Sequence, residues 1–231
     1  QLDRPFKVPS AAALAPEGDT LPPLFVIVYN RMGFGLRPGF EDEAAFNALG
    51  ANDDARLAAY VEQQLDPDAI NDSACDARIA SAGFITTGKT LRQMWEDHYR
   101  GEGVTYTWRT LAPREVERQT IMRAVYSRRQ LQEALADFWH NHFNVDAWNN
   151  VINSIFMHYD RDVIRANIFG NFREMLEDVA KITSMLYFLD NYLNTRAGPN
   201  ENFARELFEL HGMGAENYLG RSEEHTSELQ S

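Results

Sequence analysis

The sequence predicts a mostly α-helical protein whose fold is an irregular multi-helix bundle. Two patterns predict this class. Short apolar stripes recur at spacings of three and four residues, with Asp, Ser or Asn before them and Gly or Pro after them. The strict alternation of apolar and polar residues that is typical of β-strands is nearly absent. With 44% hydrophobic residues in a chain of 231, the sequence also has enough apolar side chains to fill a core.

Composition and charge exclude several classes of protein. Lys and Arg number 22 against 34 Asp and Glu, so the formal net charge is −12. A chain this acidic lacks the basic surface of a nucleic-acid-binding protein, so we expect no nucleic-acid partner. The longest purely apolar stretch, Leu24 to Val28, is far shorter than the roughly 20 residues that cross a bilayer, so we expect no transmembrane segment.

Both ends of the chain stand apart from the helical domain expected over residues 24–220. Residues 1–23 are rich in Pro and Ala and lack the basic and apolar regions of a signal peptide, so we expect a disordered or linker-like segment. Residues 221–231 read RSEEHTSELQS, a string that resembles the translation of a common sequencing-adapter read. We therefore exclude that tail from the fold and interpret the chain as a fragment.

The first predicted elements run up to residue 113. Residues 24–32 leave two alternatives open, because Val26, Ile27 and Val28 favour a strand whereas the length and the polar end equally suit a short helix. Capping residues, Gly and Pro then delimit four helices. These cover residues 41–49, 53–65, 72–82 and 91–100, and residues 101–113 are predicted to form a loop.

The later elements are also predicted as helices. Pro113 suits the first turn of a helix that runs to about Tyr126. Ser127 and Gln130 then have the spacing of a capping box, which predicts a new helix from that point. Further helices are predicted over residues 149–165, 170–181, 184–189 and 200–211.

The helix after Ser127 places one histidine on an apolar stripe. His142 follows Leu131, Leu135 and Phe138 at spacings of four, three and four, whereas His140 points the other way. An imidazole on an apolar face must find a hydrogen-bond partner or a metal ion. His142 is therefore either a satisfied core histidine, which donates to a carbonyl or a carboxylate, or a ligand or acid–base group.

Four blocks of this sequence together resemble a bacterial family known as the domain-of-unknown-function 1800 family. In chain order the blocks are RMGFGLRPG (31–39), AVYSRRQLQEALADFWHNHFNV (124–145), HYDRDVIR with GNFREML (158–176) and NENFARELFELH (200–211). The order and the spacing of the blocks match as well. One departure is Gly212, since the family pattern continues His-Thr-Leu-Gly where this chain has His-Gly-Met-Gly, which puts the end of that helix in doubt.

The resemblance implies a larger, mostly helical domain that continues past the last block. The chain would then be a truncated fragment of that all-α domain, and its stability without the C-terminal half is expected to be low. Members of the family are often predicted to be exported, which implies a location outside the cell or in the cell envelope. The family name records no activity, so the resemblance supplies a fold class and a set of candidate residues.

Two carboxylates of the last predicted helix lie one turn apart. Glu206 and Glu209 share a flank beside the apolar stripe that contains Phe203. Such a pair can share a divalent metal ion, or act as acid and base if burial separates the two pKa values. The alternative is a solvated helix edge, on which Glu209 pairs with Arg205 and Glu206 forms a cap or a salt bridge.

A metal site would combine this helix with the histidine helix. His142 and Glu206 are the candidate ligands for iron, manganese or zinc, and His211 joins them only if the helix end frays. The cofactor would then be one divalent metal ion. The third ligand would be Glu209, Asp137 or Asp190, and Glu209 and Asp137 are also the candidate catalytic residues.

Other patterns are interpreted as structural. Cys75 has no basic neighbourhood or local histidine, so nucleophilic catalysis has no visible support. The Gly33-Phe34-Gly35 stretch lacks the third glycine of a dinucleotide fingerprint and is interpreted as a tight turn. Ion pairs are expected for Arg128 and Arg129 with Glu133, and among Asp160, Arg161, Asp162 and Arg165. A core role is expected for Phe138, Trp139, Phe143 and Trp148.

Two hypotheses follow for the function. The first is a structural or interaction protein in which a buried network of histidines and carboxylates holds helices together. The alternative is a metal-dependent hydrolase or oxidoreductase that uses His142 and Glu206. The environment of His142 separates them: a ring close to two carboxylates favours the enzyme, and a ring bonded to the backbone alone favours the structural protein.

Overall fold

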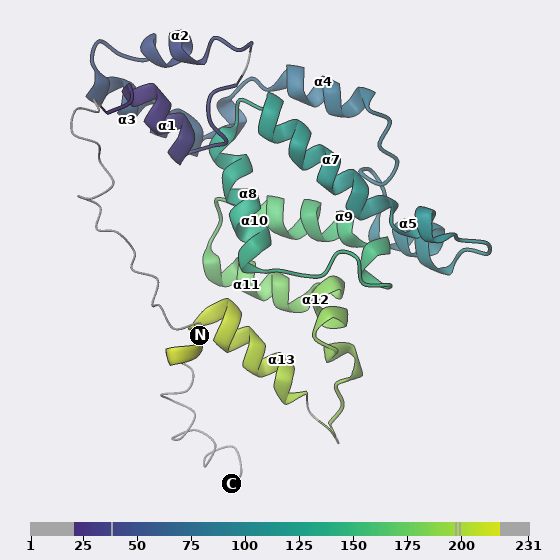
Figure 1. The fold of residues 1–231 in the computed structure, drawn as a ribbon. Helices are drawn as coiled ribbons and strands as arrows, with labels where there is room; N and C mark the ends of the chain where they lie inside the picture. The colour runs from purple at the N-terminus through teal and green to yellow at the C-terminus, as the bar shows by residue number, and fades with distance from the viewer. Residues whose placement is uncertain (1–20, 38, 197, 199, 218–231) are drawn as a thin grey trace, which may run out of the picture.

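The computed structural model describes residues 21–37, 39–196, 198 and 200–217. Over these ranges the chain forms thirteen α-helices joined by short 3₁₀ and π segments, and no β-strand is found there (Figure 1). The prediction of a mostly α, irregular multi-helix fold is thereby confirmed. The linker-like segment expected at the N-terminus lies, up to residue 20, outside the described residues, as does the adapter-like tail 221–231.

The first three helices form a small lobe at the top left of Figure 1. They are α1 (Leu24–Arg31), α2 (Asp42–Asn47) and α3 (Asp53–Leu65). Residues 24–31 thus take the helical alternative, because Val28 and Tyr29 are buried against α2 and α3 and this packing outweighs the β-propensity of the valines. The core of the lobe consists of Val28, Tyr29, Phe46 and Tyr60.

The next helices lead from this lobe into the main body. Residues 101–113, predicted as a loop, instead contain a short helix and the start of a long one. Thr105 begins the short helix, since its hydroxyl accepts a hydrogen bond from the backbone N–H of Trp108. The elements are η2 (Pro67–Ala69), α4 (Ser73–Ser81), α5 (Leu91–Trp95), η3 (Glu96–Arg100), α6 (Tyr106–Arg109), α7 (Leu111–Tyr126) and α8 (Gln130–His142).

The last elements close the main core. The predicted helix over residues 149–165 is divided, because Ile155 leaves the helical conformation with φ −119° and ψ 5°. The elements are η4 (Ile152–Ser154), α9 (Phe156–Tyr159), η5 (Asp160–Ile164), α10 (Arg165–Asn167), α11 (Phe172–Lys181), α12 (Thr183–Phe188), η6 (Asn191–Leu193), α13 (Glu201–Glu206) and η7 (Leu207–Gly212). The buried core includes Met94, Phe143, Ile152, Tyr159, Ile164, Met175, Val179 and Met185.

Three of these segments, η3, η5 and η7, are π-helical. A π turn contains one more residue than an α turn, so it redirects the side chains that follow it. Each of the three carries a buried titratable group, namely His98, Asp160 and His211, with exposed fractions of 0%, 2% and 5%. The π segments therefore place polar side chains in the interior of the fold.

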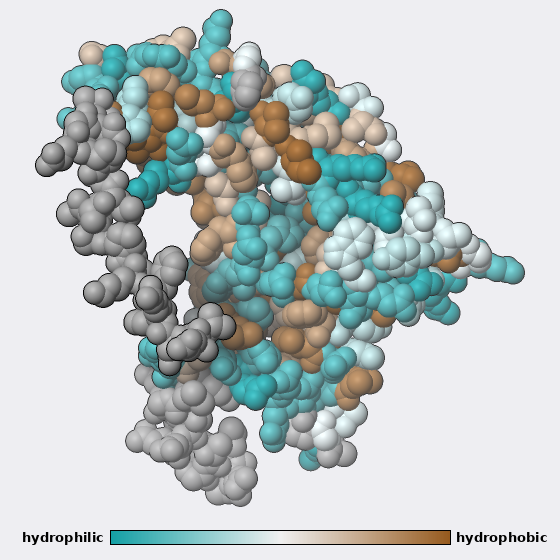
Figure 2. Space-filling model, viewed as in Figure 1, coloured by the Kyte–Doolittle hydropathy of each residue, from teal (hydrophilic) through white to brown (hydrophobic). Residues whose placement is uncertain are grey.

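The face of the molecule seen in Figure 2 is mostly polar over the residues that are coloured there. Figure 2 shows polar residues over most of the face seen in Figure 1, with scattered apolar patches between them. None of the helices described here is long and apolar enough to cross a lipid bilayer.

Candidate functional site

His142 and His211 bind each other's backbone. The Nε2 atom of His142 lies 3.1 Å from the carbonyl oxygen of His211, and Nδ1 of His211 lies 3.2 Å from the carbonyl oxygen of His142. A carbonyl oxygen only accepts, so each of these ring nitrogens carries the proton. The two residues are 69 positions apart, so the contact ties the end of α8 to η7.

The π segment explains how His211 reaches this position. On a regular α-helix His211 would point away from Glu206, five residues earlier. The π turn of η7 rotates it, and the negative charge of Glu206 is close enough to act on the ring. Burial nevertheless lowers the pKa of His211, which the bond to His142 and the charge of Glu206 only partly offset. The buried ring is therefore neutral at pH 7.

Both predicted carboxylates lie within ion-pair distance of Arg205. Arg205 lies between them: its Nη2 is 3.4 Å from Oε1 of Glu206, and its Nε is 3.9 Å from Oε2 of Glu209. The Arg205 side chain is 53% exposed, so these pairs are in contact with solvent. Among the residues that the structure describes, the ion pairs of Glu206 and Glu209 are these two contacts with Arg205.

The other two candidates also lie at the surface. Asp137 is exposed on α8, and its backbone carbonyl accepts a hydrogen bond from the side chain of Asn141. Asp190 is exposed before η6 in the left-handed conformation, with φ 55°. In the part of the chain that the structure describes, no group of three or more His, Cys, Asp or Glu side chains is arranged to hold a metal ion. The metal site and the catalytic roles remain predictions.

A buried network, of which the sequence predicted only the Arg165–Asp160 pair, lies on the opposite face of α8. His140 places Nε2 2.9 Å from Oδ1 of Asp160, which is 2% exposed. Arg165 contacts both oxygens of Asp160 through Nε, at 3.1 and 3.2 Å. The Nη1 atom of the same guanidinium lies 2.8 Å from Oε2 of Glu133. The expected Arg165–Asp160 pairing is thus present, and it extends to two residues of α8.

The electrostatics of this network favour the ionised form of Asp160. Burial by itself would raise the pKa of Asp160, but the hydrogen bond from His140 and the positive charge of Arg165 outweigh it and lower the pKa. Arg165 is itself largely buried between Asp160 and Glu133, and these two charges raise its pKa. Each buried charge therefore has an opposite charge in contact.

The buried face of α8 corrects the predicted apolar stripe. The buried positions are Gln130, Glu133 and Ala136, whereas Phe138 is 54% exposed. The core role expected for Phe138 is therefore wrong, and so is that of Trp148, which is 43% exposed. The apolar pattern predicted the wrong buried face, because the interior next to α8 contains paired charged side chains. A signal was present: Glu133 and His140 are seven residues apart and share one face of the helix.

His140 also lines a surface cleft of about 610 Å³ between α7, α8 and the loop that follows α8. Asp137, Asn141, Asp146 and Trp148 are among the other residues that line it. Asp160 contacts Nε2 of the imidazole and so orients the ring. The cleft thus combines a histidine oriented by a carboxylate with the predicted candidate Asp137.

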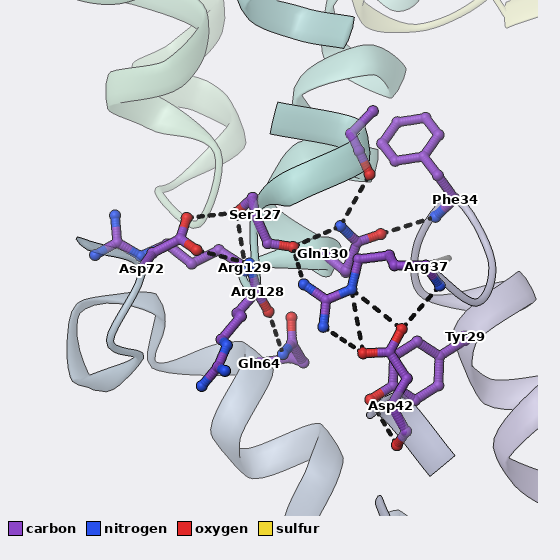
Figure 3. A network of polar contacts seen from close by, with 11 residues as sticks. Tyr29, Phe34, Arg37, Asp42, Gln64, Asp72, Ser127, Arg128, Arg129 and Gln130 are labelled. Atoms are coloured by element: carbon purple, nitrogen blue, oxygen red, sulfur yellow. Dashed lines mark hydrogen bonds and ion pairs between the residues drawn. The ribbon is translucent and has the colours of Figure 1, made fainter. Parts of the chain in front are cut away.

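A second polar network joins the small lobe to the start of α8 (Figure 3). Arg37 forms an ion pair with the buried Asp42 and donates from Nη1 to the carbonyl oxygen of Ser127 at 2.6 Å. Gln130 accepts a hydrogen bond from the backbone N–H of Phe34 at 3.1 Å. Gln64 of α3 binds the backbone on both sides of this junction, since it donates to Arg128 O at 3.0 Å and accepts from Leu131 N at 3.1 Å.

This network replaces the expected capping box. The hydroxyl of Ser127 donates to Oδ2 of Asp72 at 2.7 Å and accepts from the backbone N–H of Arg129 at 3.0 Å. The other carboxylate oxygen of Asp72 accepts from the backbone N–H of Arg128 at 2.8 Å. Ser127 and Gln130 are therefore both used in contacts between segments that are far apart in the sequence.

The fold and the two networks define an all-helical domain whose interior histidine, carboxylate and guanidinium groups are held by one another. The model of the family described as "Protein of unknown function (DUF1800)" matches residues 27–222, and the chain belongs to this family. The resemblance of the four sequence blocks is thereby confirmed. Neither the curated proteins nor the solved structures contain a match to this chain.

Proposed function

We propose that the domain is a structural or interaction protein whose histidine and carboxylate side chains hold its helices in place. The single observation that carries this proposal is the reciprocal contact between His142 and His211. A histidine bonded to a backbone carbonyl uses its N–H as a structural donor. The charged side chains on the opposite face of α8 also hold elements together, since Asp160 is bound by His140 and Arg165.

The first measurement is elemental analysis of the protein purified without added metal, together with its His142→Ala and Glu206→Ala variants. We expect less than about a tenth of an equivalent of iron, manganese or zinc in all three. Near one equivalent in the parent protein, lost in both variants, would overturn the proposal in favour of the metal-dependent enzyme. Reconstitution with each metal before the assay removes loss during purification as an explanation.

The same variants give an independent measure of stability. His142→Ala leaves the carbonyl of His211 without its donor, and we expect the free energy of unfolding to fall by about 1–3 kcal/mol. Glu206→Ala removes one partner of an exposed arginine, and we expect a much smaller change. Equal effects of the two substitutions would contradict the structural role of His142.

One observation favours a second candidate function, hydrolysis with His140 as general base. The ring lines the cleft, and its Nε2 is held by Asp160 at 2.9 Å. This arrangement of base and orienting carboxylate is the one that activates water or a hydroxyl group in many hydrolases. In such a reaction Nδ1 of His140 would accept a proton from the attacking water.

An esterase assay with p-nitrophenyl acetate tests this candidate. Hydrolysis above the rate in buffer that disappears in His140→Gln would support it. His158→Gln is the matched control, because His158 also pairs with an aspartate, Asp162 at 3.4 Å, but does not line the cleft. Equal rates in the parent protein and in both variants would remove hydrolysis by His140 from consideration.

A further inference from the structure

A second cavity, of about 580 Å³, lies between the small lobe and the junction of α7 with α8. Its walls come from α1, α2, α3, the segments that follow α1 and α3, and Arg128. Phe40, Ala45 and Ile70 provide an apolar side, and Tyr29 and Tyr60 contribute two phenol rings. The cavity thus combines an apolar side with several polar and charged side chains.

The hydroxyl group of Tyr60 has no hydrogen-bond partner among the described residues. Tyr60 is 3% exposed, and its oxygen is buried with no hydrogen bond to any residue that the structure describes. Burial raises the pKa of the hydroxyl well above its ordinary value, so the group stays protonated and remains a donor. A buried donor without an acceptor is costly, and a bound molecule with an oxygen atom would satisfy it.

Arg128 supplies a cation at the same cavity. Figure 3 shows its side chain extending from a backbone that Gln64 and Asp72 hold from two sides. Its guanidinium forms no ion pair or hydrogen bond with the described residues, and it is close enough to lower the pKa of Tyr29. The other arginine, Arg37, is already occupied by Asp42 and the Ser127 carbonyl. Arg128 is therefore the guanidinium available to a ligand here.

A side-chain carboxylate lines a different wall of the cavity. Glu41 precedes α2, lines the cavity, and has no salt bridge with any of the described residues. A ligand that matches this cavity carries one negative group for Arg128 and Tyr60, one positive group for Glu41, and an apolar part between them.

We propose that this cavity binds a free α-amino acid with an apolar side chain. The carboxylate accepts from the Arg128 guanidinium and the Tyr60 hydroxyl, and the ammonium group pairs with Glu41. The apolar side chain packs against Phe40, Ala45 and Ile70. This site is separate from the His142–His211 contact, so its test does not depend on the proposed function.

Isothermal titration calorimetry of the full chain with three matched compounds tests the proposal. L-Phenylalanine has both charges, 3-phenylpropionate lacks the amine, and 2-phenylethylamine lacks the carboxylate. We expect L-phenylalanine to bind and each analogue to bind at least about tenfold more weakly. No binding of L-phenylalanine at millimolar concentration, or equal binding of 3-phenylpropionate, would overturn the proposal.

Two variants locate the site and separate binding from folding. Arg128→Gln and Tyr60→Phe should each weaken L-phenylalanine binding about tenfold. Tyr60→Phe removes only an unpartnered hydroxyl, so the thermal midpoint should stay the same or rise. Arg118→Gln, at an exposed arginine of α7 that does not line the cavity, is the control and should bind as the parent does. Unchanged binding in both site variants would overturn the assignment.

Discussion

Arg165 is the arginine that contacts two buried carboxylates of the main body. It contacts Asp160 and Glu133, whose side chains are 3% and 6% exposed. We expect Arg165→Met to lower the free energy of unfolding by about 3–5 kcal/mol, because it leaves buried negative charge without a counter-charge. Urea denaturation followed by circular dichroism measures this change.

Arg92→Met is the matched control for Arg165. Arg92 also pairs with a carboxylate, Glu96 at 2.8 Å, but both side chains are more than half exposed. Solvent screens such a pair, so we expect no measurable change. Similar losses in the two variants would show that the buried network does not stabilise the fold.

Buried neutral histidines predict that the protein loses stability in mild acid. Burial lowers the pKa values of His98 and His211 below their ordinary 6.5. The unfolded chain therefore binds more protons than the folded protein as the pH falls through 6.5. The stability contributed by the neutral buried rings is present above that pH and is lost below it. The urea midpoint should thus decrease between about pH 7 and pH 5.

The contacts of His98 make it the better residue for testing this dependence. Its Nε2 accepts from Lys89 Nζ at 2.8 Å, and its Nδ1 donates to the Trp108 carbonyl at 2.9 Å, so protonation of the ring would break the contact with Lys89. A glutamine can accept and donate but does not titrate, so His98→Gln should show a smaller decrease of the midpoint with pH. An unchanged pH dependence would be inconsistent with this account.

Sequence patterns identified individual site residues only in part. His142 could be picked out because a titratable ring followed apolar residues, but its partner is a backbone carbonyl 69 positions away. No side-chain pattern encodes such a partner. The helical spacing correctly places His140 away from the apolar stripe, but it does not predict the contact with Asp160, which lies in another element.

At the scale of elements, the turn after α1 is fitted closely to α8. A Cβ atom added to Gly33 would lie 2.8 Å from both Cβ and Oε1 of Gln130, a buried side chain that also binds the backbone of Phe34. We expect Gly33→Ala to lower the free energy of unfolding by about 1–3 kcal/mol, because one of these segments must move. Chemical denaturation measures the loss.

Gly88→Ala is the control for this substitution. A Cβ atom added to Gly88 would have no described atom within 4 Å, and the φ angle of Gly88 is not positive. We expect Gly88→Ala to be neutral or slightly stabilising through the unfolded chain. If Gly33→Ala were equally neutral, the close approach of the turn to α8 would not matter for stability.

Helices with a clear cap and stripe could be predicted from sequence, whereas π segments could not. Asn52 caps α3 through the backbone N–H of Ala55, and the predicted range 53–65 matches the observed helix. By contrast, η5 and η7 continue helical patterns without any Gly or Pro at their start. Their register change depends on tertiary contacts of Asp160 and His211, which a local pattern does not contain.

At the scale of the whole molecule, the described part of the chain has two separate apolar cores, which predicts two levels of local stability. The small lobe buries four apolar residues, whereas the main core buries many more. Hydrogen exchange should therefore be faster in α3 than in α11. Mass spectrometry of exchanged peptides measures both helices in one experiment.

The substitution Arg37→Met should increase the difference in hydrogen-exchange rate between α3 and α11. It leaves Asp42 buried without its cation and removes the contact with Ser127, so exchange in α3 should become faster while exchange in α11 stays the same. Arg31→Met, at an exposed arginine of α1, is the control and should change neither helix. Equal acceleration in α3 and α11 would show that the molecule opens as one unit.

The contact between His142 and His211 has a consequence for proteolysis. The chain between these residues leaves the core at an exposed turn, where Thr195 and Gly198 form an isolated bridge. Exposed turns of this kind are preferred sites of cleavage. A single cut there would separate α12 from α13 along the chain. The histidine contact, with Phe203 packed on the main core, would still bind the C-terminal fragment, so the nicked protein should elute as one species under native conditions and as two only after denaturation.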